Sequence, residues 1–373
     1  MTHVRLAERK DHTHWRYREL LPISEDAALP AVYVGGTPLT RCDALARYLG
    51  LQNLYLKDEG RNATGSMKDR ASAIAVVRAK ESGNKIVSCA STGNAASSLA
   101  GMAAAMGGLR SVIFVPERAP EAKVAQLLIF GATVIRVRGS YEDAFRLCQQ
   151  SCERWGWYNR NAAINPYLVE GKKTAGLEIA EQLAFKPPDW IAVSVGDGCT
   201  IAGIWKAFRD LRALGWITRT PRLLGVQASG AAPVCEAFHT GRDLQPMVPQ
   251  TFADSIAVGV PRNWRKAILA VRESGGTMIH VPDDEILAAM RYTGRLAGIF
   301  AEPAAATAVA GVRRAVSELV IRRVETVVAV ITGNGLKDVR GAQQAAGAPF
   351  DVAADGQGLE RILESEGVLS AEC

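Results

Sequence analysis

The chain has 373 residues, of which 48% are hydrophobic and 22% charged, and it is long enough for one large or two modest domains. The formal net charge is +6, but the basic residues are scattered, as in Arg313-Arg314 and Arg322-Arg323, so we expect no nucleic-acid partner. The apolar stretches are short and the N-terminus is polar, so we expect no membrane span, no secretion signal and a cytoplasmic location.

Short runs of β-branched residues alternate with alanine-rich stretches along the chain. The first series predicts a strand at 85–90, a helix at 95–106, a strand at 110–115, a helix at 120–130, a strand at 133–138 and a helix at 141–155. The second series predicts a strand at 190–195, a helix at 201–214, a strand at 222–226, helices at 284–296 and 304–319, and a strand at 326–331. Such alternation is typical of parallel sheets covered by helices, and two α/β lobes with a cleft between them are the simplest arrangement.

The seven cysteines limit the possible chemistry. They include no C-x-x-C pair, and Cys148 and Cys152, which are four residues apart, have no histidine near them in the sequence. We therefore expect no metal site. Without a secretion signal, the cysteines are expected to be reduced thiols.

Three polar segments that contain glycine follow predicted strands: STGNAAS (91–97), GDGCTIAG (196–203) and TGNGLKD (332–338). Ligands of open parallel sheets bind at the carboxyl ends of the strands, so these loops predict a binding site. Free N–H groups at a helix start favour a phosphate or a carboxylate. Each loop alone also fits an ordinary turn or helix cap, and the second resembles a dinucleotide loop whose third glycine falls two places late.

Lys68 lies in the segment NATGSMKDR (62–70). A lysine close to a glycine is usually a solvated surface residue. A lysine that is shielded from water can be neutral and nucleophilic, as a lysine that forms a Schiff base must be. The local sequence leaves both interpretations open.

Eight segments, taken in order, resemble the threonine synthases, a family of fold-type II pyridoxal-phosphate (PLP) enzymes. They are WRYRELLP (15–22), GGTPL (35–39), NATGSMKDR (62–70), STGNAAS (91–97), NPYLVEGKKT (165–174), GDGCTIAG (196–203), EPAAA (302–306) and TGNGLKD (332–338). The resemblance covers about residues 15 to 340. WRYRELLP and TGNGLKD are typical of threonine synthases, whereas GSMKDR and STGN also occur in related dehydratases and β-replacement enzymes.

The resemblance implies a role for each of these segments. Lys68 would carry PLP as a Schiff base, Asn94 would bind the phenolic oxygen of the cofactor, and the Thr332 hydroxyl would face the pyridine nitrogen. The phosphate of the cofactor would bind the loop formed by Gly196, Asp197, Gly198, Cys199 and Thr200. The carboxylate of the substrate would bind Ser91, Thr92, Gly93 and Asn94.

The resemblance also implies the fold class. We expect a two-lobed α/β fold-type II PLP enzyme, in which a smaller α/β domain is inserted into a large domain with a parallel sheet. The large domain is expected at 1–79 and 161–345, the small domain at 80–160, and a C-terminal extension at 346–373. Members of the family are often dimers, so we expect a homodimer.

The sequence departs from the family pattern where the distal group of the substrate binds. Threonine synthases usually read S-V-N-P-x-R-x-E-G-Q-K-T, and the serine and the arginine bind the phosphate of O-phosphohomoserine. Here these positions are Ala163 and Leu168, and Lys172 replaces the glutamine. Thr200 stands in place of a family asparagine, and SIAVGVP (255–261) lacks the arginine and the asparagine of the usual A-I-R-I-G-N-P. We therefore expect a rebuilt distal substrate pocket that includes Ala163, Leu168 and Lys172.

The resemblance implies a small amino acid as substrate. PLP-dependent elimination or replacement at Cβ of a serine- or threonine-like amino acid is the favoured reaction. Three alternatives remain open, namely genuine threonine synthesis from O-phosphohomoserine, a specialised β- or γ-replacement, and an inactive PLP-binding protein. Lys172 is expected either to compensate for the lost phosphate contacts as a point charge or to be exposed to solvent.

Overall fold

The computed structural model describes residues 6, 8–162 and 164–368. Within these residues the larger of two sheets has six strands. The strands lie in the order β1 (Leu39–Arg41), β2 (Asn53–Asp58), β10 (Thr326–Ile331), β7 (Trp190–Ser194), β8 (Arg222–Ala228) and β9 (Thr277–Val281). β1 runs antiparallel to β2, and all other neighbouring strands of this sheet are parallel. β7 is buried along its whole length, which explains its nearly continuous apolar sequence.

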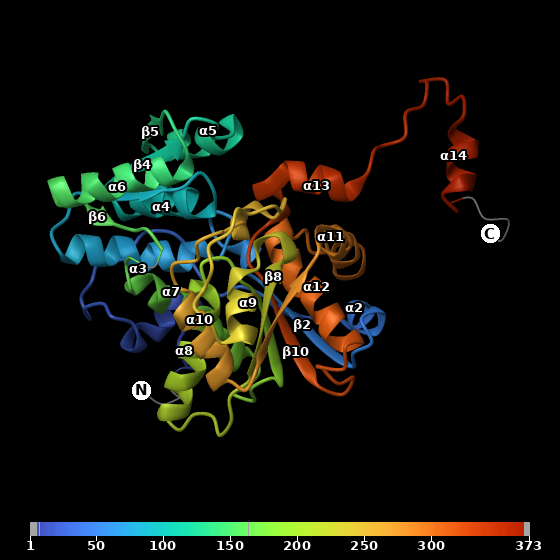
Figure 1. Ribbon diagram of the computed structural model, residues 1–373, viewed down its shortest axis with the longest axis horizontal. Helices are drawn as coiled ribbons and strands as arrows, with labels where there is room; N and C mark the ends of the chain where they lie inside the picture. Colours follow the sequence, from blue (N-terminus) through green and yellow to red (C-terminus); the bar gives the residue numbers. More distant parts are fainter. Residues whose placement is uncertain (1–5, 7, 163, 369–373) are drawn as a thin grey trace.

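Two sets of helices cover the two faces of this sheet (Figure 1). One face packs against α2 (Asp43–Tyr48), α11 (Asp283–Ala297), α12 (Pro303–Ser317) and α13 (Val339–Ala346). The other face packs against α7 (Tyr167–Gln182), α8 (Cys199–Ala213), α9 (Pro233–Thr240) and α10 (Trp264–Glu273). α12 begins with a proline, which suits the first helical turn because no amide hydrogen is needed there.

A second, smaller sheet has four parallel strands in the described part of the chain. Its strands lie in the order β5 (Thr133–Val137), β4 (Arg110–Pro116), β3 (Ile86–Ala90) and β6 (Tyr158–Asn159). One face shares a hydrophobic core with α3 (Lys68–Glu81), α4 (Asn94–Met106) and α5 (Glu121–Ile129). The other face packs against α6 (Tyr141–Trp155), which starts with a capping box between Ser140 and Asp143.

α3 and α7 pack against each other where the two sheets meet (Figure 1). Their close approach depends on Gly171, because a Cβ there would lie 2.2 Å from the carbonyl oxygen of Arg70. This contact places Lys68, the first residue of α3, at the border between the sheets. The strands of the smaller sheet all fall within 80–160, and the division of the chain into domains stays our interpretation.

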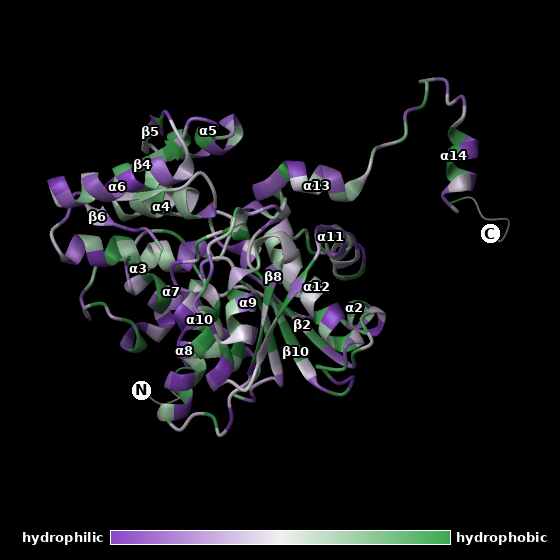
Figure 2. Cartoon of the chain, viewed as in Figure 1, coloured by the Kyte–Doolittle hydropathy of each residue, from purple (hydrophilic) through white to green (hydrophobic). Residues whose placement is uncertain are grey.

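Short 3-10 segments complete the described chain: η1 (His14–Leu20), η2 (Glu59–Arg61), η3 (Ser229–Ala231), η4 (Asp254–Ile256) and η5 (Gly335–Asp338). After α13 the chain leaves the body of the molecule, and α14 (Leu359–Ser365), which has no buried residue, stands apart from both sheets (Figure 1). Figure 2 shows apolar residues along the strands of the larger sheet and polar residues on the outer turns of the helices. No helix among the described residues is both long enough and apolar enough to cross a membrane.

The strands and helices expected from the sequence are confirmed, and their bounds differ from the prediction by two residues at most. The sequence patterns did not predict several elements that position the site, among them β2, β9, α3, α7 and α10.

Candidate active site

The start of α3 lies against the carboxyl end of β10. Ser66 forms an isolated β-bridge with Gly333, and the Met67 amide donates a hydrogen bond to the Thr332 carbonyl at 2.9 Å. Lys68 follows directly as the first residue of the helix. Two segments that are far apart in the sequence, and that both carry predicted cofactor residues, therefore meet at one point.

The residues of the segment Lys68-Asp69-Arg70 face three different environments. Asp69 accepts hydrogen bonds from the backbone amide and the hydroxyl of Thr64 at 2.7 and 2.6 Å, which fixes the preceding turn. Arg70 is fully buried and forms an ion pair with Glu178 at 2.7 Å. Lys68 instead lines a cavity. Asp69 and Arg70 therefore anchor the start of the helix, and the Lys68 amine stays available for chemistry.

A cavity of about 80 Å³ brings together the predicted residues of the cofactor site except Asn94, which lines a separate, larger cleft. The walls of the small cavity include Lys68, Ala162, Lys172, Ser194, the loop 196–200, Ser255, Ile256, Val258, Glu302, Ala304 and Thr332. Burial lowers the pKa of Lys68, and the negative charge of Glu302 opposes this effect in part. A lysine with a lowered pKa is more often the neutral amine, which is the nucleophilic form.

The N-terminus of α8 forms one wall of this cavity. Gly198 caps the helix with a φ of +93°, and among the described residues no side-chain hydrogen bond caps the helix. A Cβ at this position would lie 2.8 Å from the Cβ of Ala267, so glycine is required by space as well as by conformation. The open amides and the helix dipole favour a phosphate here.

Asp197 connects this loop to the segment before α10. Its carboxylate accepts a hydrogen bond from the Arg262 amide at 3.1 Å, and its carbonyl accepts one from the Asn263 amide at 3.1 Å. The next two residues, Cys199 and Thr200, lie in the first turn of α8 and line the cavity. The loop is therefore held in place from outside the helix.

Glu302 is a buried carboxylate beside Lys68 that the sequence analysis missed. The Asn94 side-chain amide donates to its two oxygens at 2.9 and 3.0 Å, and the Ser255 hydroxyl donates at 3.4 Å. Burial raises the pKa of Glu302, and Asn94 and Lys68 oppose that shift. The segment EPAAA (302–306) was part of the family resemblance, and an acidic residue before a proline-led helix was the available signal.

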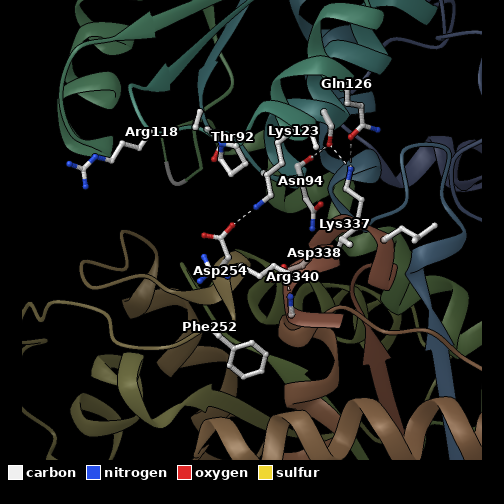
Figure 3. Close-up of a pocket in the computed structure, with 18 of the residues that line it drawn as sticks. Thr92, Asn94, Arg118, Lys123, Gln126, Phe252, Asp254, Lys337, Asp338 and Arg340 are labelled. Atoms are coloured by element: carbon white, nitrogen blue, oxygen red, sulfur yellow. Dashed lines mark hydrogen bonds and ion pairs between the residues drawn. The ribbon is translucent and has the colours of Figure 1, made fainter. Parts of the chain in front are cut away.

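A larger cleft of about 860 Å³ is lined by residues of α4 and α5 on one side and of η4, η5 and α13 on the other (Figure 3). Thr92, Gly93 and Asn94 line it at the start of α4, where no side chain caps the helix. Ser91 lies just before them, and its hydroxyl accepts a hydrogen bond from the Gly93 amide at 3.1 Å. The uncapped helix start suits the carboxylate of a substrate.

Charged side chains gather in the same cleft. Lys123 and Asp254 bridge it with an ion pair of 2.6 Å, which Figure 3 marks by a dashed line. Lys337 donates hydrogen bonds to side chains of α4 and α5 at 3.0 Å. Arg118 and Arg340 also line the cleft. The cleft therefore carries more positive than negative charge.

The residues predicted for the distal substrate pocket lie in different surroundings. Ala163 lies outside the described residues. Leu168 is fully buried against Ala71 and Ala75 of α3 and lines neither of the two cavities described above. Lys172 is 3% exposed and lines the small cavity, so the alternative that it is exposed to solvent is wrong. A role of these three residues in substrate binding stays a prediction.

The residues that line the small cavity suit the chemistry of PLP, the cofactor that the resemblance implies. The Lys68 amine can hold the aldehyde carbon, and the open N-terminus of α8 can hold the phosphate. Thr332 lines the same cavity, and its hydroxyl is the group that the resemblance assigns to the pyridine nitrogen. Lys68 begins α3, the phosphate loop leads into α8, and Thr332 directly follows β10.

The chain matches the family model described as "Pyridoxal-phosphate dependent enzyme" over residues 31–333. It belongs to this family. Threonine synthase from Methanocaldococcus jannaschii is 40% identical over 94% of this chain and 87% of that protein. Threonine synthase from Methanosarcina acetivorans is 44% identical over 87% of this chain and 80% of that protein. The chain is therefore a PLP-dependent enzyme of the threonine synthase type, in the lyase class, and the predicted cofactor is confirmed.

Solved structures support the fold class. The processed form of threonine deaminase isoform 2 from Solanum lycopersicum superposes with a TM-score of 0.70 at 24% identity, over 83% of this chain and 87% of that chain. Maize serine racemase superposes with a TM-score of 0.70 at 21% identity, over 89% and 93%. At these identities the likeness shows the fold, and the predicted fold-type II class is confirmed.

Proposed function

We propose that this PLP-dependent enzyme catalyses elimination or replacement at Cβ of a small, serine- or threonine-like amino acid. The observation that carries the proposal is the environment of Leu168. The family resemblance implies a phosphate-binding arginine at this position, whereas here an apolar side chain packs against Ala71 and Ala75. A substrate phosphate would find no guanidinium group from residue 168.

The other site residues have tasks that suit this chemistry. PLP, when bound, withdraws electrons from the α-carbon of the substrate. Lys68 accepts and returns the α-proton, because its amine lies in the cavity with a lowered pKa. The start of α4, Thr92–Asn94, orients the substrate through its carboxylate. Thr332 offers the ring a hydroxyl instead of a carboxylate, which favours elimination and replacement over transamination.

The missing phosphate contacts are large enough to change the preferred substrate. A hydrogen bond to a charged group contributes about 1.5–3 kcal/mol, and a neutral one contributes about 1 kcal/mol. Absence of both the serine and the arginine therefore weakens phosphate binding by a factor of about 10² to 10³. An uncharged substrate side chain does not need these contacts and so avoids this cost.

Threonine synthesis from O-phosphohomoserine is the second candidate. The curated relatives named above are threonine synthases, and their similarity to this protein extends over most of the chain. In addition, Arg118 and Arg340 line the large cleft next to the start of α4. Guanidinium groups bind phosphate in a bidentate way, so these two residues are the ones that would take over from the missing arginine.

Steady-state kinetics of the wild-type enzyme separate the two candidates. We expect 2-oxo acid release from L-serine or L-threonine to exceed threonine formation from O-phosphohomoserine by about 10-fold or more in kcat/KM, a difference of about 1.4 kcal/mol. Threonine formation at about 10⁴ M⁻¹s⁻¹ or above would instead establish the second candidate. In that case Arg118→Ala and Arg340→Ala should each lower kcat/KM for the phosphorylated substrate.

Restoring the family arginine is a weaker test. Leu168→Arg would place a guanidinium group against Ala71 and Ala75 without a partner in that apolar cluster, so the variant is expected to fold poorly. A homodimer and a cytoplasmic location are inferred from the family resemblance and from the cysteine usage, and both stay predictions. Light scattering of the purified protein tests the dimer.

A further inference from the structure

Lys172 is a buried cation that forms no ion pair with any described residue, although Asp197 acts on it electrostatically from the same cavity. The residue is 3% exposed, lines the small cavity, and forms no hydrogen bond or ion pair with any described residue. Its neighbour Lys173, equally buried, pairs with Glu170 at 2.7 Å and with Asp210 at 2.9 Å. A buried ammonium group without a partner is costly, so an anionic ligand is expected at Lys172.

Arg160 is a second buried cation close to this cavity. It is 2% exposed, and its Nε donates a hydrogen bond to the Ser72 hydroxyl at 3.1 Å. Its Nη2 has no hydrogen-bond partner among the residues that the structure describes. Burial, together with the charges of Lys68 and Arg160, lowers the pKa of Lys172 to about 8. Several positive charges therefore lie within reach of one another.

Helix packing directs Lys172 to the phosphate end of the cavity. A Cβ at Gly203 would lie 2.9 Å from the Cβ of Lys172, so α7 touches the first turns of α8 at this point. The Lys172 side chain lines the same cavity as Cys199 and Thr200, which begin α8. Lys172 and the N-terminus of α8 therefore line one small volume, and a positive charge and free N–H groups both favour an anion.

We propose that Lys172, supported by Arg160, is an additional cationic anchor for the phosphate group of PLP. The family pattern has a glutamine in place of Lys172, so the charge distinguishes this chain from that pattern. A phosphate monoester carries about −1.5 to −2 charges at neutral pH, which offsets the charges of both residues. The contact with α8 favours the cofactor over the distal group of the substrate, to which the sequence analysis assigned Lys172. The proposal rests on the cofactor and not on the reaction proposed above.

The first test compares PLP with pyridoxal, which lacks the phosphate. The full-length protein is stripped of its cofactor and titrated with each compound, as wild type and as Lys172→Gln. We expect the variant to bind PLP about 10-fold or more weakly, which corresponds to about 1.4 kcal/mol. Its affinity for pyridoxal is expected to stay unchanged, because the lost contact is made to the phosphate alone.

Three further variants sharpen this comparison. Lys172→Arg keeps the positive charge and is expected to retain most of the preference for PLP over pyridoxal. Arg160→Gln is expected to reduce that preference less than Lys172→Gln does. Lys206→Gln removes a more exposed lysine of α8, which pairs with Asp210 at 3.3 Å, and is expected to change neither affinity.

Two outcomes of the titrations would overturn the proposal. Equal losses for PLP and for pyridoxal would mean that Lys172 supports packing and does not bind the phosphate. An unchanged preference for PLP, combined with weaker binding of a phosphorylated amino acid by the reloaded enzyme, would assign Lys172 to the substrate. Neither outcome depends on which reaction the enzyme catalyses, so the proposed function is tested separately.

The wild-type protein offers a second measurement that does not depend on the folding of a variant. The charged and titratable groups that act on Lys172 are Lys68, Arg160, Asp197 and Cys199. At about pH 9, binding of PLP is expected to take up more protons than binding of pyridoxal, because the phosphate restores the charge of Lys172. Calorimetry in buffers of different ionisation enthalpy measures this difference, and equal proton uptake for the two compounds contradicts the proposal.

Discussion

Lys68 and Glu302 carry opposite charges when ionised and line the same cavity, where Glu302 is buried and Lys68 is half-buried. Burial favours the neutral form of both, since it lowers the pKa of Lys68 and raises the pKa of Glu302. Their mutual attraction acts the other way on each group. Asn94 binds both oxygens of Glu302 and keeps the carboxylate in place. The reactivity of Lys68 therefore depends on a residue from the opposite end of the sequence.

Glu302→Gln is expected to lower the pKa of Lys68 further, because it removes the negative charge that stabilises the ammonium form. The neutral amine would then be present at lower pH. The rate at which cofactor-free protein captures PLP should consequently shift its pH profile to lower pH, by about one unit or more. Absorbance of the linked cofactor, followed over time at a series of pH values, measures the shift.

The surface variant Asp243→Asn is the control for this experiment. Asp243 pairs with Arg265 at 3.2 Å, and both side chains are exposed. This variant should leave the profile where it is in the wild type. A profile that moves to higher pH in Glu302→Gln, or that does not move, would show that Glu302 does not stabilise the ammonium form of Lys68.

The sequence predicted the residues that belong to recognisable loops but not those whose role depends on burial. Lys68, Thr332 and the loop 196–200 meet in one cavity, as the motifs indicated. The burial of Lys172 depends on the contact between α7 and α8, which the sequence does not specify. The same holds for Arg160, whose partner Ser72 lies far from it in the chain.

At the scale of elements, a buried charge network joins α3, α7, β2 and η2. Arg70 binds Glu59 at 2.6 Å and Glu178 at 2.7 Å, and Lys57 binds Glu178 at 2.7 Å. All four side chains have 4% exposure or less, and the two positive charges balance the two negative charges. Arg70 and Lys57 hold the pKa of Glu178 far below its usual range, although burial acts against them. The network fixes the helix that begins with Lys68.

Removing one member should therefore destabilise the whole protein. Glu178→Gln leaves Arg70 and Lys57 with one carboxylate between them, and we expect a loss of about 3–5 kcal/mol of unfolding free energy. Urea unfolding followed by intrinsic fluorescence measures the change. The matched control is Glu285→Gln, whose pair with Arg314 is about one quarter to one third exposed and should contribute less than about 1 kcal/mol. Similar losses for the two variants would contradict this account of the network.

The burial of α3 and α7 explains why the sequence did not predict these two helices. A helix on the surface has one apolar stripe, whereas a helix buried on all sides has none. α3 is buried along almost its whole length, and α7 buries Lys172, Lys173 and Glu178 together with its apolar residues. Polar residues that would usually indicate a solvated face are here inside the molecule. The periodic pattern was therefore absent where the active site is built.

At the scale of the whole molecule, the candidate active site takes residues from elements that pack against both sheets. The start of α4, which packs on the smaller sheet, contributes residues to the site. The starts of α8 and α12, which pack on the larger sheet, and the end of β10 contribute the others. The ion pairs that cross between these halves include Lys123 with Asp254 at 2.6 Å and Arg262 with Glu142 at 3.0 Å. Substrate and cofactor residues thus depend on how the two halves are placed relative to each other.

The alternation of strands and helices was sufficient to predict two α/β lobes with parallel strands. It was not sufficient to predict the order of strands in the larger sheet, because β10, from the end of the chain, lies between β2 and β7. Pairings of this kind join residues that are far apart in the sequence, so local patterns contain no information on them. The family resemblance supplied what local patterns could not, namely which loops lie together.

The central claim, that Lys68 is the residue that binds PLP covalently, has one direct test. The purified full-length enzyme is reduced with borohydride, digested and mapped by mass spectrometry. We expect the pyridoxyl group on Lys68, because this lysine has a lowered pKa and lines the same cavity as Thr332. Lys172 lines the same cavity and is the internal comparison. A pyridoxyl group on Lys172 or on any other lysine, or no bound cofactor at all, would contradict the account.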